Sequence, residues 1–278
     1  MNQAQYTTKG TGKQDILIIP GGPGLDHSYL QAFFQHLDLS TYRVTTFTPK
    51  TYLATDFSKV SYEAFTQDLK EILEEIDATT PIIIGHSFGV TIATEALKRL
   101  NIPVKAFISL NMPESITKYN SNLRVLIEQL PESLSSKILE FEEKGDFGDE
   151  FFGFVLSEWY PRHAMKITPF PEEFMKSMAT FNKGLWAYAM GPNLFRMDGA
   201  LADWEIYEAF YALDFPKLFV CGDSDTIFTE DVESMAQQSK NGHSFTYPDA
   251  AHYPFIENPD TFFRKLNAFL SNLPADTK

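Results

Sequence analysis

The sequence is poor in cysteine and has no long apolar run. Its 278 residues include one cysteine, Cys221, which has no partner for an internal disulfide. No stretch approaches the roughly 18 apolar residues that a membrane-spanning helix requires. The polar start of the chain also lacks the apolar region of a secretory signal. We therefore expect a protein of the reducing cytoplasm that has no membrane partner.

Positive charge is scarce as well. The chain has 23 Lys and Arg against 37 Asp and Glu, so its formal net charge is −14. This charge repels the phosphates of nucleic acids, and we expect no nucleic-acid partner. The sequence has no Cys/His cluster, and the glycine-rich segment 20–24 lacks the Lys-Ser/Thr ending of a phosphate loop. We therefore expect no metal and no cofactor, and the oligomeric state stays open.

Apolar residues make up 44% of the chain, enough for a sizeable core. Short apolar runs, typical of buried strands, alternate with segments of helical periodicity. The strand-like runs are 15–20, 42–47, 81–86, 104–110, 217–223 and 244–248, and the clearest helical segments are 62–76, 90–100, 230–238 and 259–273. This alternation predicts an α/β fold, in which helices flank a mostly parallel sheet.

A central segment interrupts the alternation. Residues 112–204 contain helical patterns but no strand-like run, so we expect a helical cap inserted into a core formed by residues 1–111 and 205–278. The cap carries an aromatic cluster: Phe147, Phe151, Phe152, Phe154, Trp159 and Tyr160. Most of these rings are expected to form the core of the cap. Trp159 is a candidate substrate contact, since a cap over a sheet often lines the pocket beneath it.

The sharpest motif is Gly85-His86-Ser87-Phe88-Gly89, which lies between a predicted strand and a predicted helix. This is the context of a nucleophile elbow, a tight turn that exposes a serine hydroxyl above a sheet. Flanking glycines are needed there because a Cβ would collide with neighbouring backbone. The motif predicts that Ser87 is a catalytic nucleophile.

A serine nucleophile needs a histidine base and an acid that orients the base. In this fold the acid and the base follow the serine in that order, each beyond the end of a strand. Asp225 and His252 occupy such positions, and Asp223 competes with Asp225 for the role of acid. The other histidines fit the role of base less well, because they lie in the cap, beside the elbow, near the start of the chain or at the opposite end of a strand.

The oxyanion of a tetrahedral intermediate needs two hydrogen-bond donors. One is predicted to be the backbone N–H of Phe88. The other is predicted to come from the Pro-Gly-Gly-Pro-Gly segment 20–24, in which Gly22 is best placed.

These motifs resemble those of the α/β-hydrolase superfamily and, within it, of the prolyl aminopeptidases (proline iminopeptidases). The segment 20–24 is similar to that family's HGGPG, 85–89 to its elbow, and 190–204 to the MNGPNEF and GTLKDW segments at the end of its cap. The resemblance covers almost the whole chain. It implies that Ser87, Asp225 and His252 are the catalytic residues and that Gly22 and Phe88 supply the oxyanion donors.

The sequence also departs from that family where specificity is set. The peptidases hold the substrate's free amino group with two glutamates, and the resemblance places Leu194 and Thr226 at these positions. Pro20 stands at the first position of HGGPG, where the family has histidine. A buried ammonium without an acidic partner is costly, so Leu194 and Thr226 predict a pocket for a neutral group.

The sequence therefore predicts a serine hydrolase that cleaves a small ester or amide, or a short peptide, through an acyl-enzyme intermediate. Three alternatives stay open. A true prolyl aminopeptidase would hold the amine with other cap acids, such as Glu158, Asp198 or Glu205. The same scaffold could serve a non-hydrolytic lyase or oxidase, or a ligand-binding protein.

Overall fold

The computed structural model describes residues 5–274, and its centre is one seven-stranded sheet. The strands lie in the order β1-β3-β2-β4-β5-β6-β7. Every neighbouring pair is parallel except β1 with β3. The strands are β1 (Gln5–Lys9), β2 (Gln14–Ile19), β3 (Tyr42–Thr48), β4 (Ile82–His86), β5 (Ala106–Leu110), β6 (Lys217–Gly222) and β7 (Gly242–Tyr247). The predicted fold class, a mostly parallel sheet flanked by helices, is confirmed.

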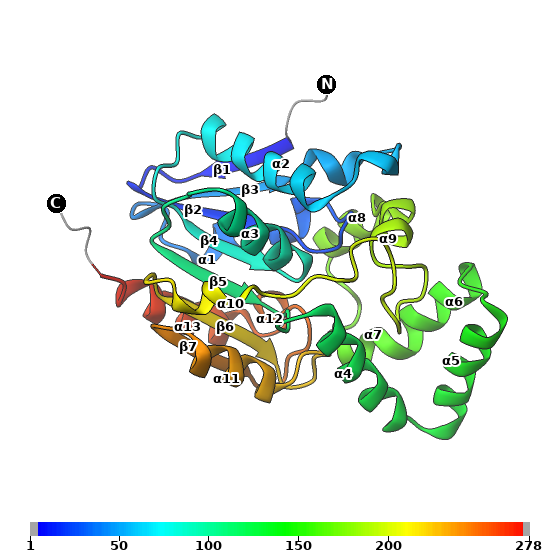
Figure 1. Cartoon of the computed structure of the whole chain (residues 1–278). Coiled ribbons are helices and arrows are strands. Elements are labelled where there is room, and N and C mark those ends of the chain that lie inside the picture. The colour runs from blue at the N-terminus through cyan, green and yellow to red at the C-terminus, as the bar shows by residue number, and fades with distance from the viewer. Residues whose placement is uncertain (1–4, 275–278) are drawn as a thin grey trace.

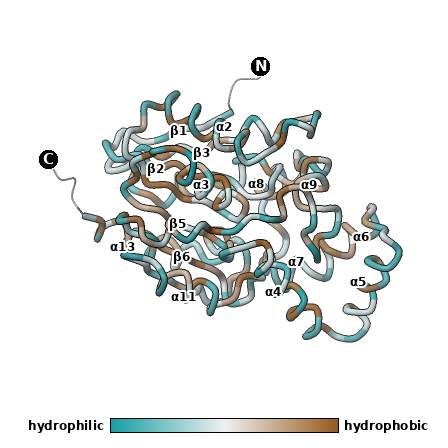
Figure 2. Tube along the Cα trace, in the orientation of Figure 1, coloured by the Kyte–Doolittle hydropathy of each residue, from teal (hydrophilic) through white to brown (hydrophobic). Residues whose placement is uncertain are grey.

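Helices cover both faces of the sheet because its central strands are apolar on both sides. In β2, Leu17 and Ile19 belong to one apolar cluster, whereas Ile16 and Ile18 belong to another on the opposite face. Figure 2 shows this pattern as apolar residues concentrated along the central strands. The helices outside the long segment between β5 and β6 are α1 (Gln31–His36), α2 (Tyr62–Glu75), α3 (Phe88–Arg99), α11 (Thr229–Gln238), α12 (Pro254–Glu257) and α13 (Pro259–Ser271), with short 3-10 turns at His27–Leu30, Lys50–Leu53 and Phe57–Lys59.

The helix α2 illustrates how the sequence sets these elements. It begins after Ser61, whose side chain accepts a hydrogen bond from the backbone N–H of Ala64 and so caps the helix. Phe65, Leu69 and Ile72 then recur at helical spacing and are all buried. Within the described residues, every helix falls short of the length and apolarity that crossing a bilayer would require.

The chain between β5 and β6 is helical. It forms α4 (Ile116–Glu128), α5 (Glu132–Lys144), α6 (Asp149–Phe154), a π-helical turn (Val155–Trp159), α7 (Tyr160–His163), α8 (Glu172–Ala179), α9 (Lys183–Ala189) and α10 (Glu208–Ala212). Figure 1 shows α4 to α9 gathered at one end of the sheet. An isolated antiparallel bridge between Ser115 and Glu205 joins the two ends of this region. The division into a core, 1–111 and 205–278, and a cap, 112–204, stays a prediction.

The packing of α3 on β2 generates a test of stability. A Cβ at Gly89 would lie 2.3 Å from the carbonyl oxygen of Ile19, whereas a Cβ at Gly153 in α6 would meet nothing within 4 Å. We expect Gly89→Ala to destabilise the protein by about 3 kcal/mol through overpacking. Gly153→Ala is the matched control and should stabilise it by roughly 0.5–1 kcal/mol, because alanine favours helix. Urea unfolding measures both, and equal midpoints would contradict the expectation.

Candidate active site

Ser87 lies on a sharp turn between β4 and α3. Its backbone has φ 52° and ψ −125°, a conformation that is strained for a residue with a side chain. The turn is closed by two glycines: a Cβ at Gly85 would lie 2.7 Å from the backbone nitrogen of Val90, and one at Gly89 would overlap the backbone of β2. The local sequence therefore produces the predicted elbow geometry, with Ser87 on the wall of a cavity.

Asp225 and His252 contact each other beside the cavity that Ser87 lines. The Oδ1 atom of Asp225 lies 2.8 Å from the Nδ1 atom of His252, and the Asp225 side chain is completely buried. Because a carboxylate oxygen accepts, Nδ1 carries the proton and Nε2 is left as a potential acceptor. No hydrogen bond joins Ser87 to His252 in the described part of the chain, although both residues line the same cavity.

Asn111 is a further partner of Asp225 that the sequence analysis missed. It directly follows β5, has a positive φ of 58° and is fully buried. Its Nδ2 donates to Asp225 Oδ2 at 2.6 Å and to the carbonyl oxygen of Ala251 at 3.2 Å. The backbone and hydroxyl of Thr226 donate to the other carboxylate oxygen, at 2.6 and 3.1 Å. The carboxylate is therefore fixed by donors on both oxygens.

The loop that carries His252 is fixed by Glu257. One carboxylate oxygen of Glu257 accepts from the backbone N–H groups of Ala251 and Tyr253, at 3.0 and 2.9 Å. The backbone N–H of His252 donates to the carbonyl oxygen of Ala164 at 2.9 Å. Burial raises the pKa of Glu257, while these backbone donors lower it. Nothing in the sequence around Glu257 indicates this role, because the contacts depend on how the loop packs.

The two predicted oxyanion donors lie on the same cavity. Gly22 has φ +118°, a conformation suited to glycine, and precedes a cis peptide bond to Pro23. Phe88 is the first residue of α3, so its N–H has no acceptor within the helix. Both residues line the cavity beside Ser87.

A buried chain of hydrogen bonds connects the Gly22 loop to the loop of His252. The backbone N–H of Gly21 donates to the hydroxyl oxygen of Tyr29 at 2.6 Å, and that hydroxyl lies 2.8 Å from His86 Nδ1. At the far side of its ring, His86 Nε2 lies 2.9 Å from the carbonyl oxygen of His252. A carbonyl only accepts, so Nε2 carries the proton and Tyr29 donates to Nδ1. Burial holds the pKa of His86 well below its usual value.

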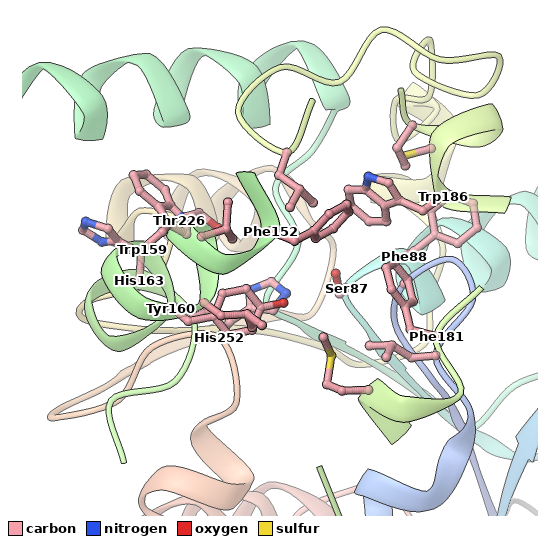
Figure 3. Close-up of a pocket in the computed structure, with 18 of the residues that line it drawn as sticks. Ser87, Phe88, Phe152, Trp159, Tyr160, His163, Phe181, Trp186, Thr226 and His252 are labelled. Carbon is pink, nitrogen blue, oxygen red and sulfur yellow. The ribbon is translucent and has the colours of Figure 1, made fainter. Parts of the chain in front are cut away.

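The cavity between the sheet edge and the helices has a volume of about 370 Å³. In Figure 3, Ser87 lies between side chains of the α7 region and those near α9. The lining residues that the sequence predicted are Ser87, His252, Gly22, Phe88, Leu194, Thr226 and Trp159, and Asp225 lies behind them. The remaining lining is mostly apolar or aromatic and comes from helices α4, α6, α7, α8 and α9, from the π-helical turn and from the loops beside them. Within residues 5–274, no cluster of His, Cys, Asp and Glu could hold a metal ion.

The described lining of the cavity contains no carboxylate. Three acids that could have held an amine lie outside it: Glu158 pairs with Arg162, Asp198 pairs with Arg196, and Glu205 belongs to the bridge with Ser115. Lys183 brings a positive charge to the lining, 4.4 Å from the centre of the Phe152 ring. A cationic substrate group therefore finds no opposite charge among the lining side chains.

Thr226 and Trp159 have contacts that fix their positions. The Thr226 hydroxyl lies 3.2 Å from the hydroxyl of Tyr119 on α4. Trp159 packs its ring against His163 and Phe195, with ring centres 4.6 and 4.9 Å apart. The third predicted contact, Leu194, packs against the same apolar cluster as Trp159.

Comparisons with known proteins agree with this architecture. Residues 16–259 match the family described as alpha/beta hydrolase fold. The proline iminopeptidase of Saccharolobus solfataricus is 22% identical, over 96% of this chain and 88% of that protein. That of Lactobacillus delbrueckii subsp. bulgaricus is 24% identical, over 94% and 91%. Among solved structures, VinJ has a TM-score of 0.87 at 20% identity, covering 97% of this chain and 95% of its own. The proline iminopeptidase of Mycobacterium smegmatis has a TM-score of 0.85 at 20% identity, covering 96% and 93%.

The Tyr29 network generates a second test of stability. Tyr29→Phe leaves the Nδ1 of His86 without its donor and the Gly21 N–H without its acceptor, both in buried surroundings. We expect a loss of roughly 1–3 kcal/mol in the free energy of unfolding. Tyr6→Phe is the control, because its exposed hydroxyl makes one 3.5 Å contact with Glu75. If urea unfolding gives both variants the same free energy of unfolding, the hydrogen bonds of Tyr29 do not contribute to stability.

Proposed function

The chain belongs to the family with the α/β-hydrolase fold, and on that premise we propose that it is a serine hydrolase acting through Ser87, His252 and Asp225. The observation that supports this most is the 2.8 Å contact between Asp225 and His252 at the cavity that Ser87 also lines. The order of the three residues along the chain is that of α/β hydrolases. Because Ser87, His252 and Asp225 are all present, we favour an enzyme over a protein that only binds a ligand.

In the proposed reaction, His252 Nε2 removes the proton of the Ser87 hydroxyl as its oxygen attacks the carbonyl carbon of an ester or amide. Asp225 holds His252 in the tautomer that leaves Nε2 free and stabilises the imidazolium that forms. His252 then gives its proton to the leaving group, and the acyl group stays on Ser87. Water, deprotonated by His252, attacks the acyl-enzyme, and the acid is released as Ser87 recovers its proton.

The proposed oxyanion donors are the backbone N–H groups of Phe88 and Gly22. The positive end of the α3 dipole lies at Phe88 and adds to the stabilisation of negative charge. Such donors act in the transition state, where removal of one typically costs about 3–4 kcal/mol. Once an apolar substrate fills the cavity, the apolar lining keeps water from the reacting groups and strengthens these interactions.

The proposed substrate is a small, neutral ester or amide. Leu194 and Thr226 line the cavity where the resemblance to proline iminopeptidases places amine-binding glutamates, and no other carboxylate of the described lining replaces them. A free ammonium would lose its hydration without gaining an ion pair. An apolar acyl group instead gains from transfer out of water.

The roles of the two neighbouring acids are separable. Asp223 bonds to Ser224 and to the backbone of Asp249, away from His252. We expect Asp225→Asn to lower kcat by roughly 10³- to 10⁴-fold, because the base loses its orienting acceptor. Asp223→Asn is the matched control and should change kcat little. The measurement is hydrolysis of p-nitrophenyl butanoate.

Labelling by a fluorophosphonate completes this test. The probe should react at Ser87, and Ser87→Ala should abolish both labelling and turnover. Stoichiometric labelling at another residue would overturn the proposed function. A larger effect of Asp223→Asn than of Asp225→Asn would move the acid to Asp223.

Specificity is tested with a free amine. We expect poor cleavage of Pro-p-nitroanilide, because its unpaired charge costs about 2–4 kcal/mol, or roughly 30- to 1,000-fold in kcat/KM. The comparison uses p-nitrophenyl acetate or butanoate, corrected for the ester's greater intrinsic reactivity, with N-acetyl-Pro-p-nitroanilide as the uncharged control. Efficient cleavage of the free Pro-anilide that is lost on acetylation would show a peptidase instead.

A further inference from the structure

Tyr119, Tyr160 and Tyr253 line the cavity, Tyr29 contacts His86 beside it, and the four hydroxyls differ in their hydrogen bonds. Tyr29 is paired with both Gly21 and His86, and Tyr119 is paired with Thr226. Within the described residues, neither Tyr160 nor Tyr253 has a hydrogen-bond partner for its hydroxyl, yet both line the cavity. Two phenol groups are therefore available to whatever fills this space.

Both unpaired tyrosines lie close to the reacting groups. The ring centre of Tyr253 is 5.4 Å from that of His252. In Figure 3, Tyr160, the first residue of α7, lies on the same side of Ser87 as His252. Burial raises the pKa of Tyr160 to about 12, and burial together with the nearby phenols raises the pKa of Tyr253 well above its usual value. Both hydroxyls therefore keep their protons at neutral pH.

Neither hydroxyl is sealed in protein, and both residues line the cavity. Tyr253 is only 4% exposed, but its hydroxyl is not among the enclosed, unpartnered polar atoms, as that of Tyr211 is. When an apolar substrate displaces water from the cavity, the phenol groups lose the hydrogen bonds that they make to that water. A substrate that offers an oxygen atom restores such a bond.

We propose that Tyr160 and Tyr253 form a subsite that donates hydrogen bonds to an uncharged ether or carbonyl oxygen of the substrate, close to the scissile bond. This inference rests on the proposed function and adds to it: the favoured substrate is an apolar ester or amide with one additional oxygen. A carboxylate suits the subsite less well, because the buried Asp225 lies behind His252 and repels it. The additional oxygen belongs either to the acyl group or to the leaving alcohol.

The test uses pairs of esters that differ by one replacement of CH₂ by oxygen. For the acyl side, p-nitrophenyl methoxyacetate is compared with p-nitrophenyl butanoate. For the alcohol side, 2-methoxyethyl butanoate is compared with butyl butanoate, with the released acid titrated. For each pair we take the ratio of two kcat/KM values, that of the oxygen-containing ester divided by that of its CH₂ analogue. The intrinsic reactivity of the esters cancels when this ratio for a variant is divided by the ratio for the wild type.

We expect Tyr160→Phe and Tyr253→Phe each to lower the ratio by about 3- to 10-fold in one of the two pairs, the change that loss of one hydrogen bond produces. The pair that responds identifies the side that carries the oxygen. Tyr211→Phe is the matched control, because it also removes an unpartnered hydroxyl but lies outside the cavity lining. Its ratios should equal those of the wild type.

The outcomes separate the subsite from the proposed function. Ester turnover that depends on Ser87, with ratios unchanged in both tyrosine variants, would overturn the subsite alone. Equal changes in Tyr211→Phe would do the same, because the effect would then not come from the cavity. If the wild type cleaves none of the four esters, the proposed function fails and the subsite fails with it.

Discussion

The turn at Ser87 is the constraint on which the site depends. Its strained backbone costs about 1–3 kcal/mol, which the burial of β4 and the packing of α3 on β2 offset. The same packing that forces the turn aims the N-terminus of α3 at the space above the serine. The proposed nucleophile, Ser87, and the proposed oxyanion donor, Phe88, are therefore positioned by the same turn, which depends on Gly85 and Gly89 having no Cβ.

The proposed acid and base depend on a second constraint, the parallel arrangement of the strands. Asn111, Asp225 and His252 follow β5, β6 and β7 and meet at one edge of the sheet, as loops at the carboxyl ends of parallel strands do. Asn111 and Asp225 are 114 positions apart in the sequence. The buried carboxylate is tolerable because each of its oxygens accepts hydrogen bonds from fixed donors.

Much of this arrangement can be predicted from the sequence, because the strands are short apolar runs and the elbow is a local motif. The positions of Ser87, Asp225 and His252 relative to those strands indicate that they meet. The supporting contacts cannot be found this way. The bonds of Tyr29 with His86 and of Glu257 with the His252 loop depend on how helices and loops pack, and neither pair has a characteristic spacing. The strand β1 is also missed, because its five residues are partly or fully exposed and lack an apolar run.

The distribution of charge and of methionine bears on specificity. The protein carries a net charge of −14, yet acidic side chains are absent from the described cavity lining. Five of the eight methionines line the cavity: Met112, Met175, Met178, Met190 and Met197. Methionine adapts to ligands of different shape, so apolar contacts alone discriminate weakly here. A missing hydrogen bond to a buried polar group discriminates more strongly. Selectivity at this site therefore depends on its few hydroxyl groups.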